Sequence, residues 1–209
     1  MSYLAQMLID KKNAAKKNLF SLYDWHCLAW KLFPDKKKED KRDFLTRIDT
    51  AEKGFYLTVL SAMEPEKPDW CTTDCWKQKF LPESFFQSKR YLFKILTNPT
   101  KTLSHRDPGG NKKKNGSHFG ITRKEELRKW FIQKGEQNGY HVLDEPELEI
   151  APPVFYKLNR KNDAGVLVGV EFKGGLEVIS IEKFASAVRK GIGRARGFGF
   201  GMFVIKPIL

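Results

Sequence analysis

The sequence predicts an α+β protein made of two consecutive units, each with the element order β-α-β-β-α-β. Amphipathic helical stretches alternate with strand-like stretches in both halves, and a basic segment with a Pro-Gly-Gly turn separates them. A chain of 209 residues with 41% hydrophobic side chains can bury one sizeable core or two small ones. We therefore expect a first unit over residues 1–99, a basic linker loop over 100–119 and a second unit over 120–209.

The first unit is expected to begin with a strand over residues 1–10, followed by a loop. The clearest helix of the chain follows at Ser21–Phe33, where Ser21 is available as N-cap and Pro34 ends the helix. The remaining elements are expected to be a hairpin of strands over Asp43–Asp49 and Phe55–Ala62 joined around Gly54, an irregular stretch over Glu64–Phe85, and a strand over Phe86–Leu96 with Tyr91, Phe93 and Ile95 on one face.

The second unit is expected to begin with a helix that a capping box of Thr122 and Glu125 opens and that ends at about Gly135 or Gly139. Its later elements are expected to be strands over Leu148–Leu158 and Gly165–Phe172, a short strand over Leu176–Ser180, a helix over Ile181–Lys190 and a closing strand over Phe198–Ile205. This order repeats that of the first unit. It predicts two tandem ferredoxin-like sheets of the RNA-recognition type, each with helices behind it.

The chain carries 38 Lys and Arg against 25 Asp and Glu, a formal charge of +13, which indicates an anionic partner. No apolar run approaches the roughly 20 residues of a membrane span, and the N-terminus lacks the pattern of a secretory signal. We therefore expect a soluble, cytoplasmic protein. Three cysteines, Cys27, Cys71 and Cys75, are expected to be free thiols, and their spacing predicts no zinc site.

His26 lies about a quarter turn from the centre of the apolar arc of the first helix, and Tyr23 shares its face. An imidazole at the edge of a core can turn one nitrogen to a ligand, and an ordinary histidine pKa of about 6.5 suits proton transfer at neutral pH. The alternative is a structural histidine that fills a gap beside two aromatic rings. His105, His118 and His141 fall in loops or at a strand start and are weaker candidates.

The segment Gly191–Gly201 follows a helix and leads into the last strand. It is not a Walker loop or a dinucleotide fingerprint, because both of those open a helix after a strand. Glycines flanked by arginines let a phosphate chain approach main-chain N–H groups closely, which suits nucleic acid. The alternative is a helix C-cap followed by a tightly packed strand.

Six stretches together resemble a known family: MSYLAQMLID, LYDWHCLAWKLFPD, DFLTRID, NPTKT, YKLNRKNDAGVLVGVEFKGGLEV and GIGRARGFGFGMFVI. In this order they are similar to the CRISPR repeat-RNA endoribonucleases of type I-E systems, the CasE family. The resemblance covers the chain from end to end. It implies a double ferredoxin-like fold that cuts precursor CRISPR RNA at the base of the repeat stem-loop without metal or cofactor. It also implies that the protein then stays on the product as a subunit of the interference complex, Cascade. On its own we expect the protein to be a monomer.

The resemblance also implies which residues act. His26 matches the family's catalytic histidine, and Tyr23 matches its tyrosine partner. The residue after the histidine is basic in some members and is Cys27 here, which leaves open the cation at the reacting phosphate. The expected RNA-binding residues are Lys31 on the helix, Lys101 in the NP-x-KT stretch, Lys157, Arg160 and Lys161 on or beside the basic hairpin, and Arg189, Gly193, Arg194, Arg196, Gly197 and Gly199 around the glycine-rich segment.

Cleavage by the 2′-OH of the substrate would leave 2′,3′-cyclic phosphate and 5′-OH ends and needs one proton taken and one given, with His26 as either base or acid. One rival is a metal-dependent nuclease built on Asp163 and the Glu171-Phe-Lys173 stretch, which has the D…ExK look of a restriction-type site. The other is a non-catalytic protein that binds structured RNA with the same basic surface.

Overall fold

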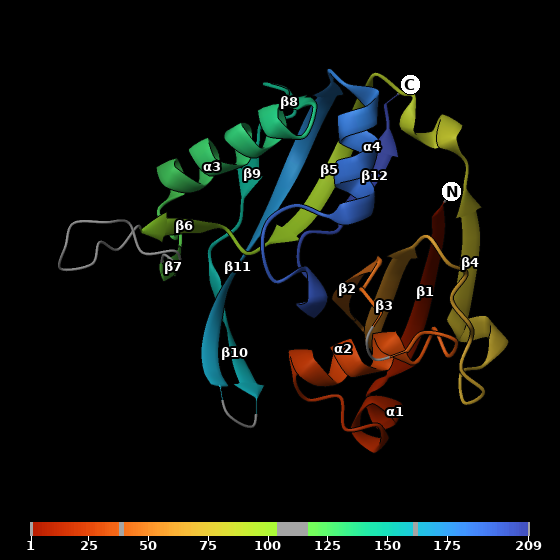
Figure 1. Cartoon of the computed structure of the whole chain (residues 1–209). Coiled ribbons are helices and arrows are strands. Elements are labelled where there is room, and N and C mark those ends of the chain that lie inside the picture. Colours follow the sequence, from red (N-terminus) through yellow and green to blue (C-terminus); the bar gives the residue numbers. More distant parts are fainter. Residues whose placement is uncertain (1, 38–39, 104–116, 161–162, 209) are drawn as a thin grey trace.

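The computed structural model of the chain describes residues 2–37, 40–103, 117–160 and 163–208, without the side chains of residues 159, 160, 163 and 164. Two antiparallel sheets form its two halves (Figure 1). Both sheets have the strand order of a ferredoxin-like unit, in which the third strand of the unit lies beside the first. The predicted fold class, two tandem ferredoxin-like units, is confirmed.

The first sheet has the order β2-β3-β1-β4. Its strands are β1 (Ser2–Asp10), β2 (Phe44–Ala51), β3 (Gly54–Ser61) and β4 (Trp76–Leu81), and its helices are α1 (Lys11–Lys16), α2 (Leu22–Trp30) and the short 3-10 helix η1 (Thr73–Cys75). The inner side chains of α2 pack with those of β1, β2 and β3 in one core cluster. The predicted helix and the hairpin around Gly54 are confirmed, although the helix ends at Trp30 instead of Phe33.

The second sheet has the order β10-β11-β5-β12, with β8 and β9 also paired to β11. Its core cluster holds the apolar faces of both second-half helices and of β5 and β11. The elements are β5 (Arg90–Thr97), α3 (Lys124–Gln137), β8 (Tyr140–Val142), β9 (Glu149–Ile150), β10 (Val154–Arg160), β11 (Asp163–Val178), α4 (Ile181–Lys190), the 3-10 helix η3 (Arg196–Phe198) and β12 (Phe203–Pro207). The predicted helix over Ile181–Lys190 is confirmed with Ser180 as its N-cap.

One strand belongs to a different sheet than its place in the sequence suggested. β5 pairs with β11 and β12 of the second sheet, because Tyr91, Phe93 and Ile95 pack into the second core. The fourth strand of the first sheet is β4, in the stretch expected to be irregular, which also holds η1 and η2 (Glu83–Phe86). The division at residues 99 and 100 stays a prediction, and the strand pairing favours a boundary before Arg90.

Four smaller expectations were wrong for local reasons. Residues 11–16 form α1 instead of a loop, because the Asp10 carboxylate caps the N–H of Asn13 at 2.8 Å. Helix α3 has Arg123, not Thr122, as its N-cap and no side-chain capping bond. The strand expected over Leu148–Leu158 is divided into β9 and β10 by a Pro-Pro pair, and the one over Leu176–Ser180 is the end of β11.

The ends of the expected linker loop are strands. Thr100–Leu103 (β6) and Ser117–Gly120 (β7) pair with each other beside α3, while His105 and the rest of the expected linker, residues 104–116, lie outside the described residues. The closing strand begins at Phe203 instead of Phe198, because the preceding residues form η3. No helix in the described part of the chain has the length and apolar character needed to span a membrane.

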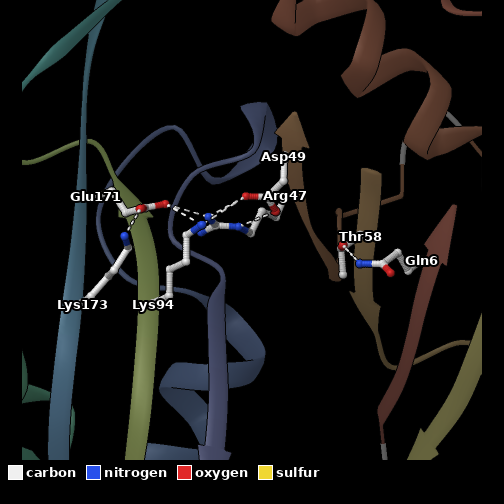
Figure 2. A network of polar contacts seen from close by, with 7 residues as sticks. All are labelled: Gln6, Arg47, Asp49, Thr58, Lys94, Glu171 and Lys173. Atoms are coloured by element: carbon white, nitrogen blue, oxygen red, sulfur yellow. Dashed lines mark hydrogen bonds and ion pairs between the residues drawn. The ribbon is translucent and has the colours of Figure 1, made fainter. Parts of the chain in front are cut away.

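A polar network joins the two sheets (Figure 2). Arg47 of β2, which is 2% exposed, donates to both carboxylate oxygens of Asp49 and to Glu171 of β11 at 2.7–2.9 Å. Lys94 of β5 and Lys173 of β11 also contact Glu171. Residues from both sheets line a cavity of about 710 Å³ at this junction. The network therefore fixes how one unit sits against the other.

Candidate active site

The helix that carries His26 is fixed at its N-terminus by a capping box. The Ser21 side chain accepts from the N–H of Asp24, and the Asp24 carboxylate accepts from the N–H of Ser21 at 2.8 Å. The opposite face of α2 is buried on the first sheet through Trp25, Leu28 and Ala29. This packing leaves Tyr23, which is 41% exposed, and the half-buried His26 at the rim of the core, as the sequence predicted.

Both ring nitrogens of His26 have partners in the structure. Nδ1 lies 2.7 Å from the carbonyl oxygen of Gly197, so this nitrogen carries the hydrogen and donates it. Nε2 accepts a hydrogen bond from the indole N–H of Trp30 at 3.1 Å. The imidazole is therefore neutral with its hydrogen on Nδ1. Its ring is also in contact with Tyr23 and Phe198, at centroid distances of 6.3 and 5.5 Å.

The partner of His26 belongs to the glycine-rich segment of the second unit. This segment runs from the end of α4 to β12, is closed by a hydrogen bond from Ile192 N–H to the Gly201 carbonyl, and contacts α2 and β2 through η3. A Cβ on Gly201 would lie 2.3 Å from the Ile192 carbonyl oxygen, so close packing explains this glycine. At Gly197 a Cβ would meet nothing closer than 3.6 Å, so a methyl group would fit there in ordinary contact with His26 and Arg42.

Arg42 is a site residue that sequence reasoning missed. It lies at the end of the mixed-charge turn before β2, where nothing in the local pattern marks it. Its Nη1 donates to the carbonyl oxygens of Phe44 at 2.8 Å and Arg196 at 2.7 Å. Burial lowers the pKa of Arg42, and the nearby Arg196 lowers it further, against the opposing effect of Asp43.

The predicted RNA-binding residues fall into separate places. Arg194 and Arg196 are exposed on the glycine-rich segment beside the Gly197 that binds His26. Lys157 is exposed on β10, which contacts α2, and lines a groove of about 470 Å³ together with Phe198 and Gly199. The side chain of Arg160 and all of Lys161 lie outside the described residues.

The other predicted positions differ in their surroundings. Lys31 is exposed as the C-cap of α2, and Gly193 lies against the Trp130 ring. Lys101 of β6 is ion-paired with Glu126 of α3 at 3.0 Å, on the far side of the second sheet from α2 (Figure 1). Arg189 binds both carboxylate oxygens of Glu83 at 2.7 and 2.6 Å and packs on the Phe86 ring. The Arg189 contacts are those of a structural residue.

The residues of the D…ExK pattern do not form one site. Asp163 and Glu171 lie on the same strand, β11, eight residues apart, which is about 26 Å along an extended chain. The carboxylate of Glu171 is already held by Arg47, Lys94 and Lys173. Among the described residues, no three His, Cys, Asp or Glu side chains cluster as metal ligands. Cys27, Cys71 and Cys75 are free thiols.

A family model described as "CRISPR associated protein" matches residues 2–207. The chain belongs to this family. The CRISPR-associated endoribonuclease Cse3 of Thermus thermophilus is 26% identical over 98% of this chain and 100% of its own length. The crystal structure of Cas6e from Escherichia coli K-12 covers 100% of both chains at 22% identity, with a TM-score of 0.71. The structure of T. thermophilus Cse3 bound to an RNA representing a pre-cleavage complex covers 99% of both chains at 21% identity, with a TM-score of 0.77.

Proposed function

We propose that this chain of the CRISPR-associated family is an endoribonuclease that cuts precursor CRISPR RNA at the base of the repeat stem-loop. The observation that carries the proposal is the hydrogen bond between His26 of the first unit and Gly197 of the second. It brings a proton-transfer group against a segment with two exposed arginines. The relative named an endoribonuclease, which matches this chain nearly end to end, supports the same activity.

The proposed reaction uses the 2′-OH of the nucleotide before the cut as nucleophile. The 2′-oxygen loses its proton and bonds to the phosphorus, the bond from phosphorus to the 5′-oxygen breaks, and the leaving 5′-oxygen takes a proton. The products carry a 2′,3′-cyclic phosphate and a 5′-OH, and no metal ion is needed. His26 moves one of the two protons through Nε2, and Tyr23, a 41% exposed residue on the same face, contacts the reacting groups.

RNA binding is assigned to two basic elements on either side of His26. The β10–β11 hairpin, with Lys157 on its exposed face, extends beside α2 (Figure 1) and holds the stem. Arg194 and Arg196 approach the backbone near the cut, with Arg160, Lys161 and Lys31 as further candidates in the binding surface. Phosphate contacts of this kind position the RNA, and the stem-loop shape supplies the selectivity.

After cleavage we propose that the protein keeps the stem-loop and becomes a subunit of the interference complex. A chain of the CRISPR RNA-guided surveillance complex in its pre-nicking state has the same fold as this one, with a TM-score of 0.72 at 17% identity. We also propose that the protein acts in the cytoplasm and is a monomer before it joins the complex, as expected from the sequence.

The decisive experiment incubates the protein with repeat stem-loop RNA, with and without EDTA. We expect one cut at the base of the stem, unaffected by EDTA, and a 5′-OH product. RNA with a 2′-deoxy nucleotide before the cut is expected to bind but stay intact, and His26→Ala is expected to lose about 10²- to 10⁴-fold in rate with binding retained. Cleavage of the deoxy RNA would show that the 2′-OH is not the nucleophile. A wild-type protein that binds and never cuts would favour the non-catalytic RNA-binding role instead.

A further inference from the structure

Two consecutive carbonyl groups of the glycine-rich segment hold two side chains of the first unit. The Gly197 carbonyl accepts from His26 Nδ1 at 2.7 Å, and the preceding carbonyl, of Arg196, accepts from Arg42 Nη1 at 2.7 Å. The imidazole and the guanidinium are thus fixed by adjacent peptide groups. Neither can shift far from the other without breaking one of these bonds.

The imidazole and the guanidinium lie on either side of one point above Gly197. The point at which a Cβ on Gly197 would stand is 3.6 Å from Cε1 and Nδ1 of His26 and 3.8 Å from Nε of Arg42. These are ordinary contact distances, and no described atom outside residues 196–198 is nearer to that point. A group bound over Gly197 would therefore touch both side chains.

A carboxylate offsets only part of the positive charge around Arg42, because the effect of Asp43 on the pKa of Arg42 is smaller than that of Arg196. No carboxylate of the described chain lies within 4.0 Å of the guanidinium of Arg42 or Arg196. Both guanidinium groups donate to neutral backbone carbonyls, and that of Arg42 also lies 5.9 Å from the centroid of the Phe44 ring. Asp43, the nearby carboxylate, is paired with Lys36 at 2.9 Å. Holding two like charges together costs free energy that a bound anion would recover.

The geometry of Arg42 leaves donors for such an anion. Nη1 serves the two carbonyls, while Nε and Nη2 have no hydrogen-bond acceptor among the described residues. A guanidinium with two such donors suits the oxygens of a phosphate. Arg42 and Arg196 also line a pocket of about 390 Å³ with Lys190. The basic surface therefore continues beyond the site, where the neighbouring part of the RNA backbone could bind.

We propose that Arg42, with Arg196 beside it, binds the scissile phosphate over Gly197 and supplies the cation that stabilises the negative charge of the phosphorane. The proposal rests on the proposed function, because it takes the cut RNA as the ligand. It assigns the cation that Cys27, the residue after His26, does not provide. His26 transfers the proton, and Arg42 contacts a non-bridging phosphate oxygen that gains charge as the 2′-oxygen attacks.

The test measures single-turnover cleavage by Arg42→Lys on RNA with a normal phosphate and with each of the two phosphorothioate isomers at the cut. We expect Arg42→Lys to slow the normal substrate by about 10²-fold, in the range for loss of one transition-state donor. In the wild type one isomer should be cut more slowly than the other, and in Arg42→Lys this difference should shrink. Affinity for uncut 2′-deoxy RNA should stay within about threefold, since other phosphate contacts remain.

Arg128→Lys serves as the matched control, because Arg128 is paired with Glu147 on the exposed side of α3. An unchanged isomer difference in Arg42→Lys would overturn the proposal and leave Arg42 as a residue that only holds the Arg196 carbonyl. So would cleavage at the wild-type rate. If the wild-type protein does not cut the RNA at all, the proposed function itself is wrong. This result differs from a failure of the Arg42 proposal, in which the wild type cuts the RNA and Arg42→Lys behaves like it.

Gly197→Ala is the second variant and leaves Arg42 in place. Its methyl group makes only ordinary contacts at 3.6–3.8 Å, so the melting temperature should stay that of the wild type. The methyl group would, however, occupy the space assigned to the phosphate. We expect cleavage to fall by at least about tenfold. A folded Gly197→Ala protein that cuts at the wild-type rate would show that the phosphate binds elsewhere and would overturn the proposal.

Discussion

The indole N–H of Trp30 donates to Nε2 of His26, one helical turn earlier on α2, at 3.1 Å. Together with the bond from Nδ1 to the Gly197 carbonyl, it fixes one tautomer and one ring orientation of the imidazole before RNA binds. Nε2 is also the nitrogen that would meet the substrate in the proposed reaction. The RNA must therefore take the place of the indole at this nitrogen.

The first prediction concerns that tautomer. In the protein without RNA, long-range proton–nitrogen NMR of His26 at a pH where its ring is neutral should show the hydrogen on Nδ1. The reason is that Nε2 accepts from Trp30 and has no room for a hydrogen of its own. A spectrum with the hydrogen on Nε2 would contradict the arrangement of both bonds.

The second prediction concerns Trp30→Phe, which keeps a ring against Phe44 and removes the N–H. The RNA no longer competes with a hydrogen bond whose net free energy is about 0.5–1.5 kcal/mol, so single-turnover cleavage should rise by about 2- to 10-fold. The melting temperature of the variant serves as the control for packing. A fall in rate would mean that Trp30 holds the imidazole in its reactive position.

The way the two halves join was not predictable from local patterns. Helix α4 followed from apolar spacing, which acts within about ten residues, whereas its Ser180 cap was not predicted. The alternation of Tyr91, Phe93 and Ile95 showed a strand, yet alternation does not say which sheet the strand joins. The contact of His26 with Gly197 spans 171 residues, so only the folded chain brings them together.

Arg42 and Glu171 show the same limit at the level of charge. Sequence reasoning left the turn with Arg42 unassigned and considered Glu171 as a metal ligand. In the structure, Arg42 reaches the carbonyl of Arg196 from the other half of the chain, and Glu171 meets Arg47 and Lys94 from two other strands. A charged side chain takes its role from such distant partners, and the local pattern of a single sequence does not reveal them.

The third prediction separates two arginines that the sequence placed in one group. Arg194→Ala should weaken RNA binding and reduce the slope of log affinity against log salt by about 0.7–0.9, the value for one lost phosphate contact. Arg189→Ala should leave that slope unchanged and lower the free energy of unfolding by about 1 kcal/mol, because Arg189 is bound to Glu83 and Phe86. Salt titrations of RNA binding measure the slope, and urea unfolding measures the free energy of unfolding. Equal salt slopes for the two variants would contradict the assignment.

The fourth prediction concerns Gly201→Ala as the counterpart of Gly197→Ala. The added Cβ would lie 2.3 Å from the Ile192 carbonyl oxygen, and the backbone at Gly201 has φ = +81°. The closing bond of the glycine-rich segment should break, with a loss of about 1–3 kcal/mol in the free energy of unfolding. Cleavage should fall as well, because Gly197 would move from His26. A variant that unfolds like the wild type would show that the segment adapts without its glycine.

The fifth prediction concerns pH and the network between the sheets. Burial raises the pKa of Asp49 and of Glu171, but the bonds and charge of Arg47, with Lys94, outweigh burial and hold both pKa values below their ordinary 3.8 and 4.5. Because both carboxyl pKa values are lower in the folded state than in the unfolded state, the network contributes its full stabilisation at pH values above the unfolded-state pKa values. This stabilisation is lost as the pH falls through the folded-state pKa values. The melting temperature should therefore drop below about pH 4.5.

Two variants test how this network contributes to stability, one in acid and one at neutral pH. Asp49→Asn should flatten the acid drop in melting temperature, whereas Glu52→Gln, a change at an exposed turn residue, should leave it unchanged. At neutral pH, Arg47→Met should cost about 3–5 kcal/mol, because it leaves Asp49 and Glu171 between the sheets without their shared cation. If Asp49→Asn follows the wild-type curve, the acid sensitivity comes from carboxylates elsewhere in the fold. A small loss in Arg47→Met would show that Lys94 alone neutralises both carboxylates.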